Sequence, residues 1–298
     1  MKHLIDAFRG FCMALADSVP GVSGGTVAFI LGFYDKFINS LNNLISGNKE
    51  ERIDAIKFLA KLLAGWAVGM ALAVLVLTNL FETHIYAVSS VFLGFIVFAI
   101  PVIIMEEKET MKGKYINIIF TIIGIAIVAA ITYFNPVSGE GTSVDISSLN
   151  FGLCVYVFVA AMVAISAMVL PGISGSTLLL IFGLYIPVIS ALKELLHFNL
   201  SYLPVIIIFG LGLITGILLI IKLIKKALEK YRPQTIYLII GLMIGSLYAI
   251  VMGPTTLDVP QEPMSFSTFS IIYFIVGGVI IFGLEKAKDF LESKEDKK

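Results

Sequence analysis

The chain has 298 residues, of which 58% are hydrophobic and 14% are charged, and its mean hydropathy is +0.97. Soluble domains carry about 25% charged residues, so this sequence has too little polar surface to cover a water-soluble globule of its length. The composition therefore predicts an integral membrane protein. The 21 Lys and Arg residues balance the 21 Asp and Glu residues, which gives no electrostatic basis for a nucleic-acid partner.

Potential metal ligands are few and dispersed. Cys12 and Cys154 lie in apolar runs, and His3, His84 and His197 show no ligand spacing. We therefore expect no metal, no cofactor and no catalytic residues, and a protein that is not an enzyme.

Two kinds of apolar segment follow one another along the chain. A helix needs about 20 residues to cross the hydrocarbon layer of a membrane. Two apolar regions are interrupted by Pro and Gly and predict broken or re-entrant helical hairpins, whereas six uninterrupted runs predict transmembrane spans. In chain order we expect a hairpin at about 1–45, spans at about 58–80, 86–105 and 115–134, a hairpin at about 151–197, and spans at about 202–224, 235–253 and 268–285.

Glycines spaced four positions apart recur in these spans. Such pairs allow two helix backbones to approach closely, so they predict helix packing and no chemistry. They occur at 65/69, 212/216 and 241/245.

Charge in the loops predicts the orientation. Lys and Arg cluster before the first span, after the second and fourth spans, and at the end of the chain, whereas loops 81–85, 135–150 and 254–267 contain neither residue. Cytoplasmic loops are rich in Lys and Arg. We therefore expect a multi-pass protein of the cytoplasmic (inner) membrane with both termini in the cytoplasm.

The chain also contains an internal duplication. The motif at 20–26 (Pro-Gly-Val-Ser-Gly-Gly-Thr) reappears 151 positions later at 171–177 (Pro-Gly-Ile-Ser-Gly-Ser-Thr). The loop charges place the start of the first half inside and the start of the second half outside. We therefore expect an all-α fold of two inverted repeats, 1–146 and 147–298, each a broken hairpin followed by three spans. Transporters with inverted repeats bind their substrate where the repeats meet, near the middle of the membrane.

Each motif predicts that one helix ends inside the membrane and another begins. The breaks are expected at Pro20-Gly21 and Pro171-Gly172. The first N–H groups of a new helix lack partners within the helix, and such an end favours anions, notably phosphate. The alternative is a packing kink whose polar groups satisfy one another. The predicted phosphate-binding residues at the two helix starts are Ser23, Gly24, Gly25, Thr26, Ser174, Gly175, Ser176 and Thr177.

Charged residues accompany only the first motif. Asp6, Arg9 and Asp17 lie on one stripe of a predicted helix, and ionisable residues inside a membrane are costly and often functional. Arg9 is the candidate cation for an anionic substrate. Asp17 either carries a coupling proton or only braces Arg9. For Asp6 and Arg9, the alternative is an i, i+3 pair at the level of the lipid headgroups.

The two motifs resemble those of a known family. The stretches 17–26 (Asp-Ser-Val-Pro-Gly-Val-Ser-Gly-Gly-Thr) and 170–176 (Leu-Pro-Gly-Ile-Ser-Gly-Ser) are similar to the twin motifs of the bacterial PopT-type undecaprenyl phosphate translocases. The resemblance extends over essentially the whole chain. It implies a flippase that returns undecaprenyl phosphate from the outer to the inner leaflet, so that this lipid carrier can serve cell wall biogenesis again. Its partners would be the polyprenyl phosphate lipid and the bilayer, with protons or another ion as an open choice of coupling species.

Three other functions remain alternatives. An ion-coupled secondary transporter of a small soluble anion would use the same helix ends. A lipid phosphatase would need a base or a metal, which the dispersed histidines do not supply. A structural protein would gain nothing from charge placed beside helix breaks.

Overall fold

The computed structural model describes residues 2–18, 23–73, 78–134, 146, 150–196, 198–256 and 260–295, and all secondary structure in these ranges is helical. The helices of the first half are α1 (Lys2–Asp17), α2 (Gly24–Ile30), α3 (Tyr34–Ser46), α4 (Lys49–Leu72), α5 (Thr78–Glu106), α6 (Lys108–Met111) and α7 (Ile118–Tyr133). Those of the second half are α8 (Phe151–Val169), α9 (Gly175–Ile181), α10 (Tyr185–Leu196), α11 (Leu203–Lys230), α12 (Arg232–Met252) and α13 (Ile271–Glu295). Short 3-10 helices occupy Tyr115–Asn117, Leu200–Tyr202 and Gly253–Thr256.

Among the described residues, six helices are long and apolar enough to cross a membrane, which confirms an all-helical, multi-pass membrane protein. Five of them, α4, α5, α7, α11 and α12, overlap predicted spans, although α4 begins well before the predicted start at 58 and ends at Leu72. The sixth is α8, which the sequence indicated only as the first arm of a broken hairpin. It has 19 residues because its apolar run continues without interruption up to Leu170 and Pro171. The remaining predicted span lies in α13.

Both predicted broken regions consist of three consecutive helices, α1 to α3 and α8 to α10. In the second region, Gly172 has a φ of +86°, a left-handed conformation that glycine adopts without strain. The corresponding break in the first region was predicted at Pro20 and Gly21, which lie outside the described residues. The described helix α2 begins after it, where the side chain of Ser23 caps the helix.

The long helices pack as four close pairs: α1 with α4, α8 with α11, α5 with α13, and α7 with α12. The predicted role of the glycine pairs in packing is confirmed. A Cβ at Gly65 in α4 would overlap the carbonyl oxygen of Ala7 in α1. One at Gly212 in α11 would overlap that of Phe158 in α8, and Gly241 in α12 meets the backbone of α7 in the same way.

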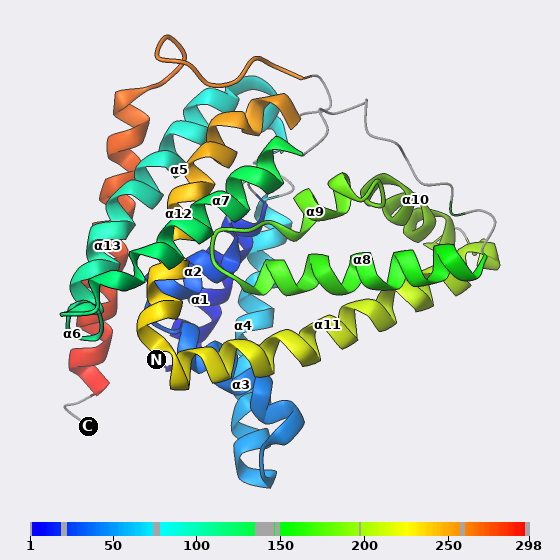
Figure 1. The fold of residues 1–298 in the computed structure, drawn as a ribbon, viewed down its shortest axis with the longest axis horizontal. Helices are drawn as coiled ribbons and strands as arrows, with labels where there is room; N and C mark the ends of the chain where they lie inside the picture. The colour runs from blue at the N-terminus through cyan, green and yellow to red at the C-terminus, as the bar shows by residue number, and fades with distance from the viewer. Residues whose placement is uncertain are drawn as a thin grey trace.

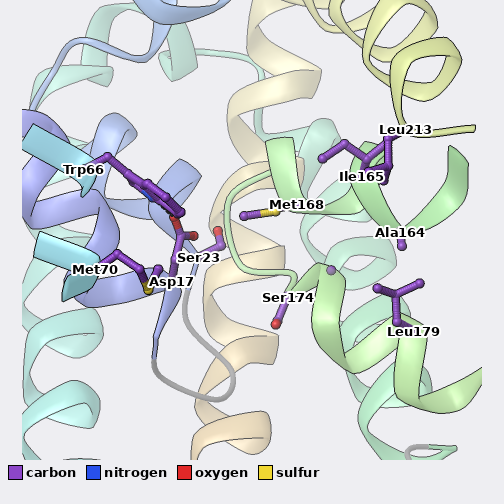
Figure 2. Close-up of a pocket in the computed structure, with 11 residues that line it drawn as sticks. Asp17, Ser23, Trp66, Met70, Ala164, Ile165, Met168, Ser174, Leu179 and Leu213 are labelled. Atoms are coloured by element: carbon purple, nitrogen blue, oxygen red, sulfur yellow. Dashed lines mark hydrogen bonds between the residues drawn. The ribbon is translucent and has the colours of Figure 1, made fainter. Parts of the chain in front are cut away.

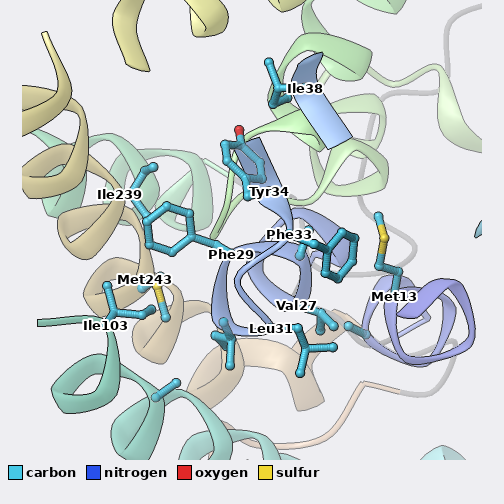
Figure 3. Close-up of a cluster of buried hydrophobic side chains, with 14 of the residues drawn as sticks. Met13, Val27, Phe29, Leu31, Phe33, Tyr34, Ile38, Ile103, Ile239 and Met243 are labelled. Carbon is cyan, nitrogen blue, oxygen red and sulfur yellow. The ribbon is translucent and has the colours of Figure 1, made fainter. Parts of the chain in front are cut away.

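The main hydrophobic core surrounds α2, every residue of which is buried. Figure 3 shows Phe29 and Leu31 from this region beside Ile103 of α5 and Ile239 and Met243 of α12, and all five belong to one buried cluster. The short helix α2 is therefore fixed against the long helices α5 and α12.

The two sides of the molecule differ in arrangement (Figure 1). The N-terminus, α3, α6 and the C-terminal end of α13 lie toward the bottom of the view, and the segment that leads from α12 to α13 lies at the top. Helices α8, α10 and the N-terminal part of α11 extend to the right, away from the bundle of α5, α7, α12 and α13.

Candidate functional site

A pocket of about 240 Å³ lies between the two broken regions, where Asp17 and Ser23 of the first region and Ser174 and Gly175 of the second both line it. Figure 2 shows Asp17, Ser23 and Trp66 grouped on one side, Ala164 and Leu179 on the other, and Ser174 between them. The lining residues are Asp17, Ser23, Trp66, Met70, Ala164, Ile165, Met168, Ser174, Gly175, Leu179 and Leu213. The pocket thus has a polar end, made by the two breaks, and an apolar end, made by α8, α9 and α11.

Hydrogen bonds join the start of α2 and Tyr34 to the second helix break. The backbone N–H of Gly172 donates to Oγ1 of Thr26 at 2.8 Å. In the opposite direction, the Ser23 hydroxyl donates to the carbonyl oxygen of Leu170 at 3.3 Å, and the Tyr34 hydroxyl donates to that of Val169 at 3.1 Å. Residues about 150 positions apart in sequence therefore form one polar junction at the centre of the molecule.

The Thr26 hydroxyl is expected to matter for stability. In Thr26→Val, the buried N–H of Gly172 loses its acceptor, which costs about 1–3 kcal/mol. The midpoint of thermal unfolding of the purified protein in detergent should fall. Thr26→Ser keeps the hydroxyl, so its unfolding midpoint should fall less. A Val variant at least as stable as the Ser variant would contradict this role.

The carboxylate of Asp17 binds the start of α2. Its Oδ1 accepts the N–H of Gly24 at 2.6 Å, and its Oδ2 accepts the indole Nε1–H of Trp66 in α4 at 3.0 Å. Asp17 is the last residue of α1, so its carboxylate sits across the break from the helix it caps. A carboxylate is a favourable partner for the positive end of a helix.

The prediction of open amides at the start of α2 is therefore wrong for two of its residues in this conformation. The N–H of Gly24 is bonded to Asp17, and the N–H of Thr26 is bonded to Oγ of Ser23 at 3.3 Å. Gly25 lies against the backbone of Val169 at the junction of the two breaks. The sequence gave no indication that the Asp17 side chain would accept a hydrogen bond from the first turn of α2, so the hydrogen bond from Gly24 was not predicted.

The second break presents a different surface. Ser174 occupies the N-cap position of α9, but its side chain makes no capping hydrogen bond, unlike Ser23 in the first half. Ser174 and Gly175 both line the pocket. The residue that corresponds to Asp17 is Met168, so the second half places a thioether where the first has a carboxylate. Thr177 lies in the first turn of α9, and the side chain of Ser176 lies outside the described part of the structure.

The structure does not bring Arg9 to the pocket. Its guanidinium lies 3.5 Å from Oδ1 of Asp6, as the alternative i, i+3 pair predicted, and 4.9 Å from the centre of the Phe33 ring. Lys36 of α3 also contacts Asp6, at 3.4 Å. The Asp17 carboxylate accepts hydrogen bonds from Gly24 and Trp66, and Arg9 does not brace it here. Arg9 lies two helical turns before Asp17, which is too far along α1 for direct contact.

Sequence reasoning missed Trp66. It is the only tryptophan in the sequence, and it lies next to Gly65 in a span with few polar groups. Indole N–H groups in apolar surroundings need an acceptor, and this requirement could have identified Trp66 as a partner of a buried carboxylate.

Comparison with known proteins identifies a family for this chain. A model of the VCA0040-like family, described as undecaprenyl phosphate translocase-like, matches residues 13–268. The chain belongs to this family. The match spans both breaks and the pocket between them.

Two relatives share most of the chain. A polyprenyl-phosphate transporter of Staphylococcus aureus is 34% identical over 93% of this chain and 94% of its own length. A polyprenyl-phosphate transporter of Vibrio cholerae is 30% identical over 87% of this chain and 80% of its own length. These names indicate a transporter rather than an enzyme. No solved structure matches the chain.

Proposed function

We propose that this protein is a flippase that moves polyprenyl phosphate, and specifically undecaprenyl phosphate, from the outer to the inner leaflet of the bacterial cytoplasmic membrane, where it recycles the lipid carrier for cell wall biogenesis. The observation that carries the proposal is the pocket between the breaks. Its polar end, at Ser23 and Ser174, suits a phosphate, and its apolar end, at Ala164 and Leu213, suits a prenyl chain. The two relatives named as polyprenyl-phosphate transporters support the same substrate.

The pairing of the helices supports two inverted repeats. In the proposed correspondence, α1 to α5 match α8 to α12, and α7 matches α13. The pair α1–α4 then corresponds to α8–α11, and the pair α5–α13 corresponds to α12–α7. Each close contact thus has a counterpart when the halves are exchanged, as expected for two related repeats. The start of α1, the end of α13 and α6 lie toward one side of the molecule, which supports cytoplasmic termini (Figure 1).

Hydroxyl and N–H donors at the pocket would replace water around the phosphate. The groups that line it include the Ser23 and Ser174 hydroxyls, the Trp66 indole and the backbone at Gly175. In this conformation the Ser23 hydroxyl donates to Leu170 and the Trp66 indole donates to Asp17, so both must change partner to bind a phosphate. Gly24, Gly25, Thr26, Ser176 and Thr177 complete the two helix starts that we assign to phosphate binding. Because Gly24 and Thr26 are engaged within the protein, their N–H groups become available only if Asp17 and Ser23 rotate away.

Asp17 links phosphate binding to a proton. Among the described lining residues there is no Lys or Arg, and Asp17 is the only carboxylate. Two unit charges about 5 Å apart repel by about 3 kcal/mol at an effective dielectric constant of about 20. We infer that Asp17 is protonated when the phosphate enters, so that a proton accompanies the lipid headgroup.

Reconstitution tests the function. Liposomes containing the protein and a labelled polyprenyl phosphate should exchange the label between leaflets faster than protein-free liposomes, as measured with a membrane-impermeant quencher. A labelled phosphatidylcholine serves as the control for general scrambling and should not exchange faster. If the polyprenyl phosphate crosses at the protein-free rate while the proteoliposomes take up inorganic phosphate, the protein is a transporter of a soluble anion instead.

A further inference from the structure

An ion cluster joins the two halves at some distance from the pocket. Arg232, the first residue of α12, contacts two acidic residues of the first half. Its Nη1 donates to Oδ2 of Asp35 in α3 at 2.8 Å. Its Nε donates to Oε2 of Glu107, between α5 and α6, at 3.2 Å, and its Nη2 donates to Oε1 of the same carboxylate. The guanidinium therefore holds Glu107 in a bidentate pair, the strongest arrangement of this kind.

The cluster is coupled to the junction of the breaks through α3. Asp35 directly follows Tyr34, whose hydroxyl donates to the carbonyl oxygen of Val169 at the end of α8. Helix α3 also packs on α11 of the second half. The first turn of α3 thus contacts α12 through Asp35 and the end of α8 through Tyr34.

The corresponding contact in the other half is not made. If the halves matched in every contact, α10 would pack on α4 as α3 packs on α11. Among the described residues, α10 has no comparable packing on α4. Figure 1 shows the two helices well apart, with α10 at the far right and α4 near the centre. The molecule is therefore closed on the α3 side and spread apart on the α10 side.

We propose that the cluster of Arg232, Glu107 and Asp35 is a gate that closes the pocket toward the side of the Lys- and Arg-rich loops, and that the structure represents the state open to the opposite side. The proposal rests on the proposed function, in which the phosphate must leave toward the cytoplasm. For that step α3 has to separate from α12 and α11, which breaks the Arg232–Asp35 pair and moves Tyr34 from Val169.

The three side chains are suited to a contact that opens and closes. The exposed fractions are 37% for Arg232, 46% for Asp35 and 14% for Glu107, so solvent can reach each group when the cluster separates. Partly exposed ion pairs contribute modestly, because water competes for the charges. Loss of the cluster should therefore shift the balance between two states by about tenfold rather than unfold the protein.

Cysteine accessibility tests the gate. In a background with Cys12→Ala and Cys154→Ala, Met168→Cys places a thiol in the pocket, and Glu50→Cys marks the side of the Lys- and Arg-rich loops. A membrane-impermeant maleimide is applied to spheroplasts, which expose the outer face of the membrane, and to inverted membrane vesicles, which expose the inner face. With Arg232 present, Met168→Cys should react mainly from the side opposite Glu50→Cys.

The Arg232→Gln variant should raise the labelling rate of Met168→Cys from the Glu50→Cys side by about tenfold. Lys57→Gln is the matched control, because Lys57 pairs with Asp54 at 3.4 Å on the exposed surface of α4 and crosses no interface. The Lys57→Gln variant should leave the labelling rate of Met168→Cys unchanged. Asp35→Asn, which removes one partner only, should give a smaller rise and serves if Arg232→Gln fails to fold.

Unchanged labelling in both Arg232→Gln and Asp35→Asn would overturn the gate. Labelling needs no lipid phosphate, so the result is independent of transport. Unchanged labelling together with active lipid exchange refutes the gate alone, whereas a clear labelling shift without any lipid exchange refutes the proposed substrate alone.

Discussion

Replacing Asp17 by Asn is expected to make polyprenyl phosphate exchange insensitive to a proton gradient. Asn has the shape of Asp, and its side-chain oxygen can still accept from either Gly24 or Trp66. Its NH2 group then faces the other donor, so one of the two hydrogen bonds is lost and the other is kept. The amide of Asn cannot take up a proton as the carboxylate of Asp does. The pocket would then receive the phosphate without the accompanying proton and without repulsion from a carboxylate.

The measurement compares exchange in proteoliposomes with and without an imposed pH gradient. The wild-type protein should respond to the gradient, and Asp17→Asn should exchange at one rate under both conditions. Comparison of the two proteins removes the contribution of the phosphate's own titration, which both share. Asp54→Asn, at an exposed position on α4, is the control and should behave like the wild type. An Asp17→Asn protein that still responds fully would rule out Asp17 as the proton carrier.

The double replacement Ser23→Ala and Ser174→Ala is expected to reduce lipid exchange by at least about a hundredfold. Each hydroxyl lines the pocket and comes from a different half of the chain. A hydrogen bond to a charged group contributes about 1.5–3 kcal/mol, and each 1.4 kcal/mol is a factor of about ten. Each single replacement should show a substantial part of this loss, because both serines contact the same phosphate.

Folding must be separated from transport in this experiment. Ser246→Ala is the matched control, since this buried hydroxyl donates to the carbonyl oxygen of Met243 within α12 and does not line the pocket. It should exchange lipid at a rate close to that of the wild type. All variants should elute as single species from size-exclusion chromatography in detergent. A double variant that folds and exchanges lipid at more than half the wild-type rate would remove both serines from the site.

The positions of the helix breaks could be predicted from sequence because their causes are local. Pro171 cannot continue α8, Gly172 adopts a left-handed φ, and a serine follows two positions later to begin the next helix. The close helix pairs were also predictable in part, since Gly65 and Gly212 remove the Cβ atoms that would keep two helices apart.

The partners of the charged groups could not be predicted in the same way. Asp17 reaches Trp66 across 49 positions, and Arg232 reaches Glu107 across 125. Such contacts depend on how the helices assemble, and no local pattern encodes them. The same limit explains why the partner of Arg9 could not be predicted. Its spacing along α1 allowed either Asp6 or Asp17 as a partner. In the folded protein Phe33 lies beside Arg9 and Lys36 contacts Asp6, and both depend on how α3 and the residue before it pack against α1.

A structure of the protein with bound polyprenyl phosphate would test the central claim most directly. The phosphate should lie between the two breaks, within hydrogen-bonding distance of Ser23 and Ser174, with the prenyl chain passing over Ala164 and Leu213. A phosphate bound elsewhere, with no lipid in the pocket lined by Asp17, Ser23 and Ser174, would contradict the claim.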